Sequence, residues 1–207
     1  MSPPILRPRP PRRLALFWGL ALLFLASAFS PPARAADLRV SPQGWAEQDG
    51  QRYACVLGRS GVRADKREGD GATPAGDWPV RRVWYRPDRQ PVPLTAGLPV
   101  RAIAPEDGWC DEPTHPEYNR PVKLPFSASH ENLWRADHLY DLVVELGYND
   151  DPVVPGRGSA IFLHLARPDR SPTAGCVAFA LEDLLAILRR LGPGDHVLIH
   201  RAPPAGH

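Results

Sequence analysis

The chain has 207 residues, which is enough for one domain with a sizeable core and a terminal processing segment. Hydrophobic residues make up 43% and charged residues 23%, a globular composition that excludes wholesale disorder. The 26 prolines favour loops, turns and edge strands over a helical bundle.

The first 35 residues have the pattern of a secretory signal peptide. Four arginines precede an apolar run over 14–29, and Ala33-Arg34-Ala35 offers a cleavage site before Ala36. The run is shorter than the ~20 residues that a membrane span needs, so membrane contact would come only through an uncleaved segment. Cleavage removes five arginines and no acidic residue, changing the formal charge from +2 to −3. We therefore expect an exported, periplasmic or envelope protein that does not bind nucleic acid.

Three cysteines in an exported chain leave at least one thiol without an internal partner. Cys55 and Cys110 are the candidates for a disulfide, which would leave Cys176 free. Two separate reduced core cysteines are the alternative, because free cysteine is a common buried residue.

The first half of the chain is predicted to be β-rich with long connections. In chain order we expect a lead-in over 36–40, a hairpin over 45–57 that turns at Asp49-Gly50, a glycine-rich loop over 58–78, a strand over 78–85 and a short strand over 98–104. The segment 107–132 lacks periodicity and is expected to be a long irregular loop of the kind that often carries function.

The second half combines strands with one helix. Alternation predicts a strand with Tyr140, Leu142, Val144 and Leu146 on one face, and "SAIFLH" (159–164) an internal strand buried on both faces. Leucines at helical spacing predict a helix over 181–191 with arginines 189 and 190 in its last turn. A strand over 196–200 and a disordered tail over 201–207 follow. The expected fold is α+β, mostly β, in a single domain over 36–200.

Two reactive side chains stand twelve positions apart, His164 at the end of the internal strand and Cys176 after a glycine. A thiol with a pKa of ~8.5 is mostly protonated at neutral pH, and a histidine within reach can take its proton. Gly175 permits a tight turn that leaves backbone N–H groups for an oxyanion. The alternative is a buried histidine and a buried cysteine without chemistry.

Three segments, "SAIFLH", "SPTAGCVAF" and "DGATPAGDW", resemble the L,D-transpeptidase catalytic domain of the YkuD type, in a divergent exported branch. The family's strand histidine corresponds to His164, its elbow to residues 173–176 and its "TPxG" turn to residues 73–76. The similarity extends over about 56–199. It implies a β-sandwich or open barrel with one helix after the catalytic cysteine.

The resemblance also implies acyl transfer on peptidoglycan stem peptides. Cys176 would attack the peptide carbonyl, and His164 would act as general base and then as acid. The backbone N–H groups of Gly175 and Cys176 would bind the oxyanion. An amine or water would resolve the thioester, giving transpeptidase or carboxypeptidase activity. The resemblance implies no metal and no organic cofactor.

Further positions concern the binding of substrate and metal. Ala174 and Ala178 replace residues usual in the family, so substrate details do not transfer. Candidate substrate-binding residues are Thr173, Arg167, Tyr118, Asn119 and Asn149, although asparagine also caps turns and tyrosine also packs on cores. Histidines 115, 130 and 138 are not spaced as a zinc site.

Two other kinds of protein are compatible with these patterns. The first is a catalytically silent periplasmic module of the same fold that binds peptidoglycan, which the altered elbow favours. The second is a sortase-like transpeptidase, although that class has a longer His-to-Cys interval and places its arginine on a strand.

Overall fold

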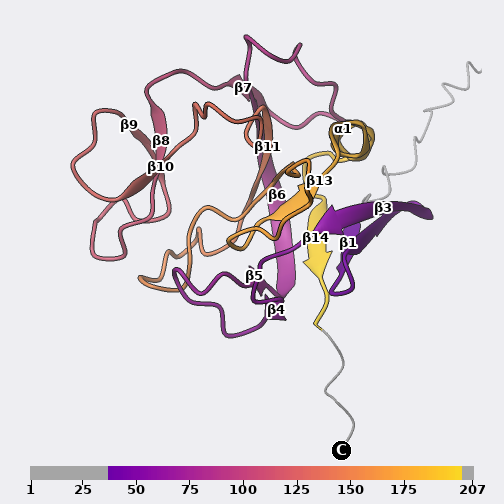
Figure 1. Ribbon diagram of the computed structural model, residues 1–207, viewed down its shortest axis with the longest axis horizontal. Coiled ribbons are helices and arrows are strands. Elements are labelled where there is room, and N and C mark those ends of the chain that lie inside the picture. Colours follow the sequence, from indigo (N-terminus) through magenta and orange to yellow (C-terminus); the bar gives the residue numbers. More distant parts are fainter. Residues whose placement is uncertain (1–36, 202–207) are drawn as a thin grey trace, which may run out of the picture. The chain divides into compact units, whose positions relative to one another are not determined.

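The computed structural model describes residues 37–201, so the predicted signal peptide and the tail from residue 202 lie outside the described residues. The described part is mostly β with one helix (Figure 1). The elements are β1 (Leu38–Ser41), β2 (Trp45–Gln48), β3 (Gln51–Val56), β4 (Val62–Arg63), β5 (Thr73–Pro74), β6 (Gly76–Tyr85), β7 (Val100–Ala102), β8 (Asp107–Cys110), β9 (Pro121–Lys123), β10 (His130–Asn132), β11 (Leu142–Leu146), β12 (Phe162–Leu165), β13 (Val177–Phe179), α1 (Leu181–Leu188) and β14 (His196–Ile199).

The main sheet closes on itself. Its nine strands run in the order β11-β12-β13-β3-β2-β1-β14-β6-β7, and β11 also pairs with β6. The ten-residue β6 makes this possible, because its first half pairs with β14 and its second half with β11. Closure leaves only the three-residue β7 as an edge of this sheet and gives the barrel-like, mostly β architecture that the sequence predicted.

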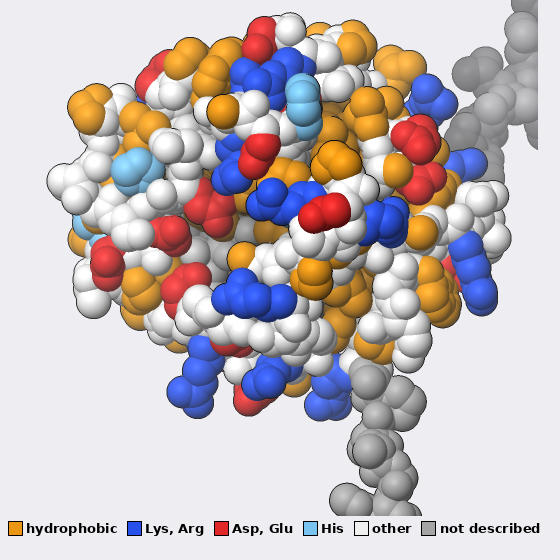
Figure 2. Space-filling view, viewed as in Figure 1, with side chains coloured by type: hydrophobic (Ala, Val, Ile, Leu, Met, Phe, Trp, Pro, Cys, Tyr) orange, Lys and Arg blue, Asp and Glu red, His pale blue; other side chains and the backbone are white. Residues whose placement is uncertain are grey.

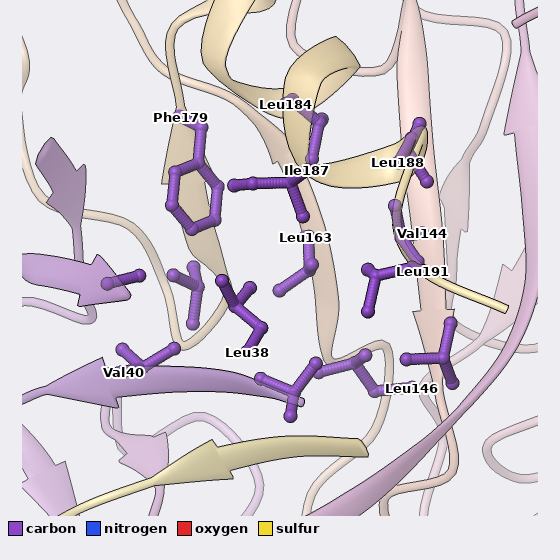
Figure 3. Close-up of a cluster of buried hydrophobic side chains, with 14 of the residues drawn as sticks. Leu38, Val40, Val144, Leu146, Leu163, Phe179, Leu184, Ile187, Leu188 and Leu191 are labelled. Carbon is purple, nitrogen blue, oxygen red and sulfur yellow. The ribbon is translucent and has the colours of Figure 1, made fainter. Parts of the chain in front are cut away.

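The barrel is filled from within and covered by α1. Inward side chains from the strands meet Leu184, Ile187 and Leu188 of the helix, all fully buried (Figure 3). Burying each such side chain stabilises the fold by about 1.5–3 kcal/mol. The helix ends at Leu188, earlier than predicted, so Arg189 and Arg190 follow it; Arg190 still donates to the Ala186 carbonyl at 3.3 Å. None of the helices within 37–201 is long and apolar enough to cross a membrane.

The predicted hairpin over 45–57 is confirmed. Strands β2 and β3 pair antiparallel, and both turn residues have positive φ, 50° at Asp49 and 78° at Gly50. Such a turn matches the twist of the two strands.

Two expectations for irregular backbone were wrong. The lead-in is strand β1, which pairs parallel with β14. The segment 107–132 contains the strands of a separate small sheet, in the order β10-β8-β9. Asp107 anchors this sheet by accepting the Ala104 N–H at 2.8 Å and pairing with Lys123 at 2.7 Å. Both findings depend on partners distant in sequence.

The small sheet covers a second buried cluster on the outer face of the barrel. Trp84 of β6, Val143 of β11 and Phe162 of β12 point to this face, where they meet Trp109 and Leu133. The neighbouring residues Val83, Val144 and Leu163 point into the barrel. Strands that are buried on both faces, as predicted for β12, therefore have side chains in two different clusters.

Candidate active site

The thiol and the imidazole lie on the same outer face of the barrel. β12 and β13 run parallel, with His164 opposite Ala178 and Leu163 opposite Val177. Since side chains alternate along a strand, Phe162 and His164 share one face, and Leu163 and Val177 point into the barrel. Cys176 stands two residues before Ala178 and receives the Phe162 N–H at 3.4 Å on its Sγ. The parallel register therefore brings Cys176 and His164 to one surface.

Both side chains line a cleft of about 380 Å³. The cleft extends from the elbow to the small sheet and has both polar and apolar walls. Other residues that line it include Glu131, Arg135, Tyr140, Ser159, Arg167, Thr173, Ala174, Gly175 and Ala178. Ala178 lies opposite His164 in the parallel register and also lines the cleft.

Cys176 is a buried, neutral thiol at rest. Its Sγ donates to the Ala160 carbonyl at 3.2 Å. Burial raises the pKa of the thiol to about 12, and the charge of Glu131 acts in the same direction, whereas the Phe162 N–H and Lys66 oppose the rise. A thiol with this pKa is a weak nucleophile until a base removes its proton.

His164 is a neutral base. Its Nδ1–H donates to the Leu165 carbonyl at 2.8 Å, which leaves Nε2 as the proton-accepting nitrogen. Burial lowers the pKa of the imidazole to about 4, and the Tyr140 ring packs edge-on at 5.4 Å between centroids. No hydrogen bond joins Cys176 to His164, both of which lie in the described region, so the resting pair is neutral rather than ionic.

This neutral state predicts slow alkylation of Cys176. We expect iodoacetamide to modify Cys176 slowly at pH 7, with a rate that rises about tenfold per pH unit up to pH 11, because only the thiolate reacts. Mass spectrometry of the peptide that contains Cys176 measures the rate. A plateau already reached near neutral pH would instead reveal a preformed thiolate.

The elbow requires glycine at 175. Gly175 has φ +150°, and a Cβ there would lie 2.9 Å from the Ala72 carbonyl oxygen. Thr173 Oγ1 accepts the Gly175 N–H at 3.1 Å and donates to the Cys176 carbonyl at 2.7 Å. Thr173 therefore holds the elbow together. One of the two predicted oxyanion donors, the Gly175 N–H, is engaged in this resting structure.

The "TPxG" turn supports the elbow from behind. Thr73 is fully buried, and its Oγ1 accepts the Gly58 N–H at 2.8 Å. Gly58 in turn forms a parallel bridge with Thr173. The turn and the elbow, a hundred residues apart, are thus two ends of one hydrogen-bonded support.

We expect Gly175→Ala to destabilise the elbow. The new Cβ meets a backbone oxygen that cannot rotate away, in addition to the strain at positive φ, so the cost should exceed the ~1 kcal/mol of the φ strain alone. Gly156→Ala is the matched control, since Gly156 has φ +75° with no atom within 4 Å of the added Cβ. Urea unfolding of both variants measures the difference, and equal costs would contradict the clash.

Three predicted substrate-binding residues have structural contacts instead and do not line the cleft. The Tyr118 hydroxyl donates to Glu68 at 2.5 Å and accepts the Gly158 N–H. Asn149 closes the loop over 149–158 through bonds to Val154 and Gly158. These two side chains brace the backbone beside the site.

Asn119 supports the backbone next to the thiol. Its Oδ1 accepts the Ala160 N–H and the Trp109 Nε1–H, both at 3.0 Å, and its Nδ2 donates to the carbonyls of Tyr148 and Asn149. Ala160 has φ +52°, unusual for alanine, and its carbonyl holds the Cys176 thiol. Arg167 and Thr173, by contrast, do line the cleft.

The sequence reasoning missed the cleft residues Glu131 and Arg135, and it placed Tyr140 on the wrong side. Tyr140 was expected to share a face with Leu142, but it precedes β11 and packs with Phe162 and His164. Glu131 lies in the segment 107–132, which has no periodicity in sequence. No local sequence signal separates Tyr140 from the strand that follows it.

The three cysteines are free and buried, so the Cys55–Cys110 disulfide is not formed. Cys55 lies in the barrel core, whereas Cys110 lies in the small sheet. Within residues 37–201 no group of three or more His, Cys, Asp or Glu side chains is placed to hold a metal ion. On the face in Figure 2, basic and acidic side chains interleave, without a single-sign patch.

A thiol and a neutral imidazole in one cleft, with a glycine elbow beneath the thiol, define the class of site that performs cysteine-dependent acyl transfer. The family model for the L,D-transpeptidase catalytic domain, YkuD, matches residues 42–199. The match covers more than half of the chain, and the protein therefore belongs to this family, whose members act on peptidoglycan. No curated protein and no solved structure gives a match.

Proposed function

We propose that this protein is an exported peptidoglycan L,D-transpeptidase in which Cys176 forms an acyl-enzyme on stem peptides. The observation that carries the proposal is the placement of Cys176 and His164 on one face of the barrel, in the same cleft, in a chain of this family. The predicted signal peptide over 1–35 supports action in the periplasm.

The first half-reaction transfers the acyl group to sulfur. The substrate carbonyl enters the cleft at the elbow, and His164 Nε2 takes the thiol proton as Sγ attacks the carbonyl carbon. The large gap between the two pKa values disfavours a stable ion pair, so we expect proton transfer together with S–C bond formation. His164 then returns the proton to the leaving amine, and the thioester remains.

The oxyanion needs a backbone donor at the elbow. The Cys176 N–H is the donor in this proposal. The Gly175 N–H would contribute only after leaving Thr173 Oγ1, to which it donates at rest. Arg167, which lines the cleft, is suited to a substrate carboxylate because guanidinium binds carboxylates in a bidentate manner.

The second half-reaction resolves the thioester. An amine of another stem peptide would give a cross-link, and water would give the carboxypeptidase product. In both cases His164 is available to accept the proton of the attacking group.

Incubation of the purified protein with tetrapeptide muropeptides tests the proposal. Mass spectrometry should detect an acyl adduct on Cys176, followed by release of the terminal residue and formation of cross-linked or shortened products. Cys176→Ala is the control that cannot form the adduct.

The competing function is a catalytically silent module that binds peptidoglycan, favoured by the departures at Ala174 and Ala178. It predicts identical muropeptide profiles for wild type and Cys176→Ala, with both proteins still pelleting with sacculi. That result would replace the enzyme proposal.

A further inference from the structure

Glu131 is a cleft carboxyl without a cationic partner. It lies at the centre of β10, pairs across to Trp109 and lines the same cleft as Cys176. No Lys, Arg or His nitrogen within residues 37–201 lies within 4.0 Å of its carboxylate oxygens. Leaving a partly buried carboxylate unpaired is costly, so an unpaired one that faces a cleft is suited to a cationic ligand.

One hydrogen bond fixes the direction of this carboxyl. The Tyr140 hydroxyl donates to Glu131 Oε2 at 2.6 Å. No described residue donates to Oε1, which leaves that oxygen for a ligand. Tyr140 itself is held by ring packing against Phe162 and His164. The carboxyl is therefore oriented by a side chain that also contacts the proposed base.

The other carboxylate of the cleft is already used. Glu68 Oε2 accepts the hydroxyls of Tyr118 and Ser159, and Oε1 accepts the Gly69 N–H. These bonds tie the loop over 58–78 to the rest of the cleft wall. Glu68 is therefore part of the support, and Glu131 is the cleft carboxylate that keeps an unused acceptor.

Glu131 lines the same cleft as the thiol, so both side chains can act on one substrate. Its negative charge raises the pKa of Cys176, and burial raises the pKa of Glu131 itself. The cations Arg59, Lys66, Arg135 and Arg167 also line the cleft. Two of them are already paired, Lys66 with Asp70 and Arg135 with Asp137. Because burial penalises the charged form of an unpaired carboxyl, a cationic ligand at Glu131 would stabilise its carboxylate.

We propose that Glu131, oriented by the Tyr140 hydroxyl, binds the ammonium group of a primary-amine acceptor and deprotonates it, so that the acyl-enzyme is resolved by an amine in preference to water. This inference rests on the proposed thioester at Cys176. In this inference the small sheet, which covers the barrel, also provides the side of the cleft that binds the acceptor amine.

The protons balance as follows. The bound R–NH3⁺ gives one proton to the Glu131 carboxylate and becomes R–NH2. The nitrogen lone pair attacks the thioester carbon, forming the C–N bond, and the C–S bond breaks. The second proton passes from nitrogen through His164 to the departing sulfur, which restores the thiol. Glu131 then releases its proton to solvent.

The test compares how wild type and variants partition one thioester between two products. With a disaccharide tetrapeptide as both donor and acceptor, mass spectrometry measures the acylation rate of Cys176 and the ratio of cross-linked dimer to hydrolysed product. Glu131→Gln keeps the size of the side chain and an acceptor for Tyr140 but loses the charge. We expect it to lower the ratio by at least about tenfold, the strength of a charge-assisted hydrogen bond, so that transfer to the amine falls by much more than acylation changes.

Three further variants make the result specific. Glu117→Gln removes an exposed carboxylate from the same segment and should leave the ratio unchanged. Glu131→Asp should recover part of the ratio, since the charge remains on a shorter side chain. Tyr140→Phe should lower the ratio less than Glu131→Gln, because it removes the orienting hydroxyl and keeps the carboxylate.

An unchanged ratio in Glu131→Gln, with normal acylation, would overturn this inference and leave the proposed function intact. An equal loss of acylation and transfer would also overturn it, because Glu131 would then serve the first half-reaction or the fold. Failure of wild type to form any thioester would refute the proposed function, and this inference with it.

Discussion

Cys176→Ala is expected to abolish turnover of muropeptides, with a loss of at least about 10⁴-fold, because no other group can form the covalent intermediate. Thr173, the hydroxyl nearest in sequence, donates to the Cys176 carbonyl and braces the elbow. Its oxygen is a poor substitute for the sulfur. The measurements are the adduct mass and product formation over time.

The fold should tolerate this substitution. Cys176 belongs to the outer cluster, and alanine removes only the weak bonds of Sγ with Ala160 and Phe162. Cys110→Ala is the matched control, since Cys110 is also a buried free thiol but lies in β8, outside the cleft. It should retain activity. Product formation by Cys176→Ala at the wild-type rate would exclude Cys176 as the nucleophile.

The signals for the candidate pair, His164 and Cys176, are local in sequence, and the catalytic role that they indicate stays a prediction. An apolar strand that ends in His164 and a glycine immediately before Cys176 both lie within twenty residues. That the two side chains lie on the same face could not be predicted locally, because it depends on the parallel register in which His164 lies opposite Ala178. A shift of one residue would turn Cys176 into the barrel, and nothing in the local pattern sets that register.

The acceptor side of the cleft could not be predicted, because its strands are too short to show alternation. β8 and β10 have four and three residues, and they pair with each other although they lie far apart in the chain. Glu131 therefore lay in a segment without a pattern. The position of Asn119 outside the cleft has a related cause. Asparagine in a loop is equally suited to binding a ligand and to bracing backbone, and its four partners come from three distant segments.

The protonation states of His164 and Cys176 also could not be predicted from the sequence. The spacing of His164 and Cys176 suggested a base that takes the thiol proton, but burial raises one pKa and lowers the other. Desolvation penalises the charged form of each group, and its size depends on the completed packing around both. The resting site is neutral for this reason.

His164→Asn is expected to lower the acylation rate by about 10²–10⁴-fold, the usual contribution of a general base. Asparagine preserves a donor for the Leu165 carbonyl, which His164 Nδ1 binds at 2.8 Å, but it cannot accept the thiol proton. In wild type, activity should fall as the pH drops through about 4, where the imidazole becomes protonated and stops acting as a base. The acidic side of the pH profile of kcat/KM measures this fall in activity.

The same substitution should remove a pH dependence of stability. The unfolded chain protonates His164 below about pH 6.5, whereas the folded protein keeps it neutral down to about pH 4. Unfolding therefore takes up a proton between these values, and the free energy of unfolding falls as the pH drops through this window. A shift of this size corresponds to a stability contribution on the order of 3 kcal/mol, which is present in full above pH 6.5 and is lost as the pH falls to about 4. Urea unfolding at pH 7, 5 and 4 should show a smaller loss in His164→Asn than in wild type, and parallel losses would show that His164 is not buried in its neutral form.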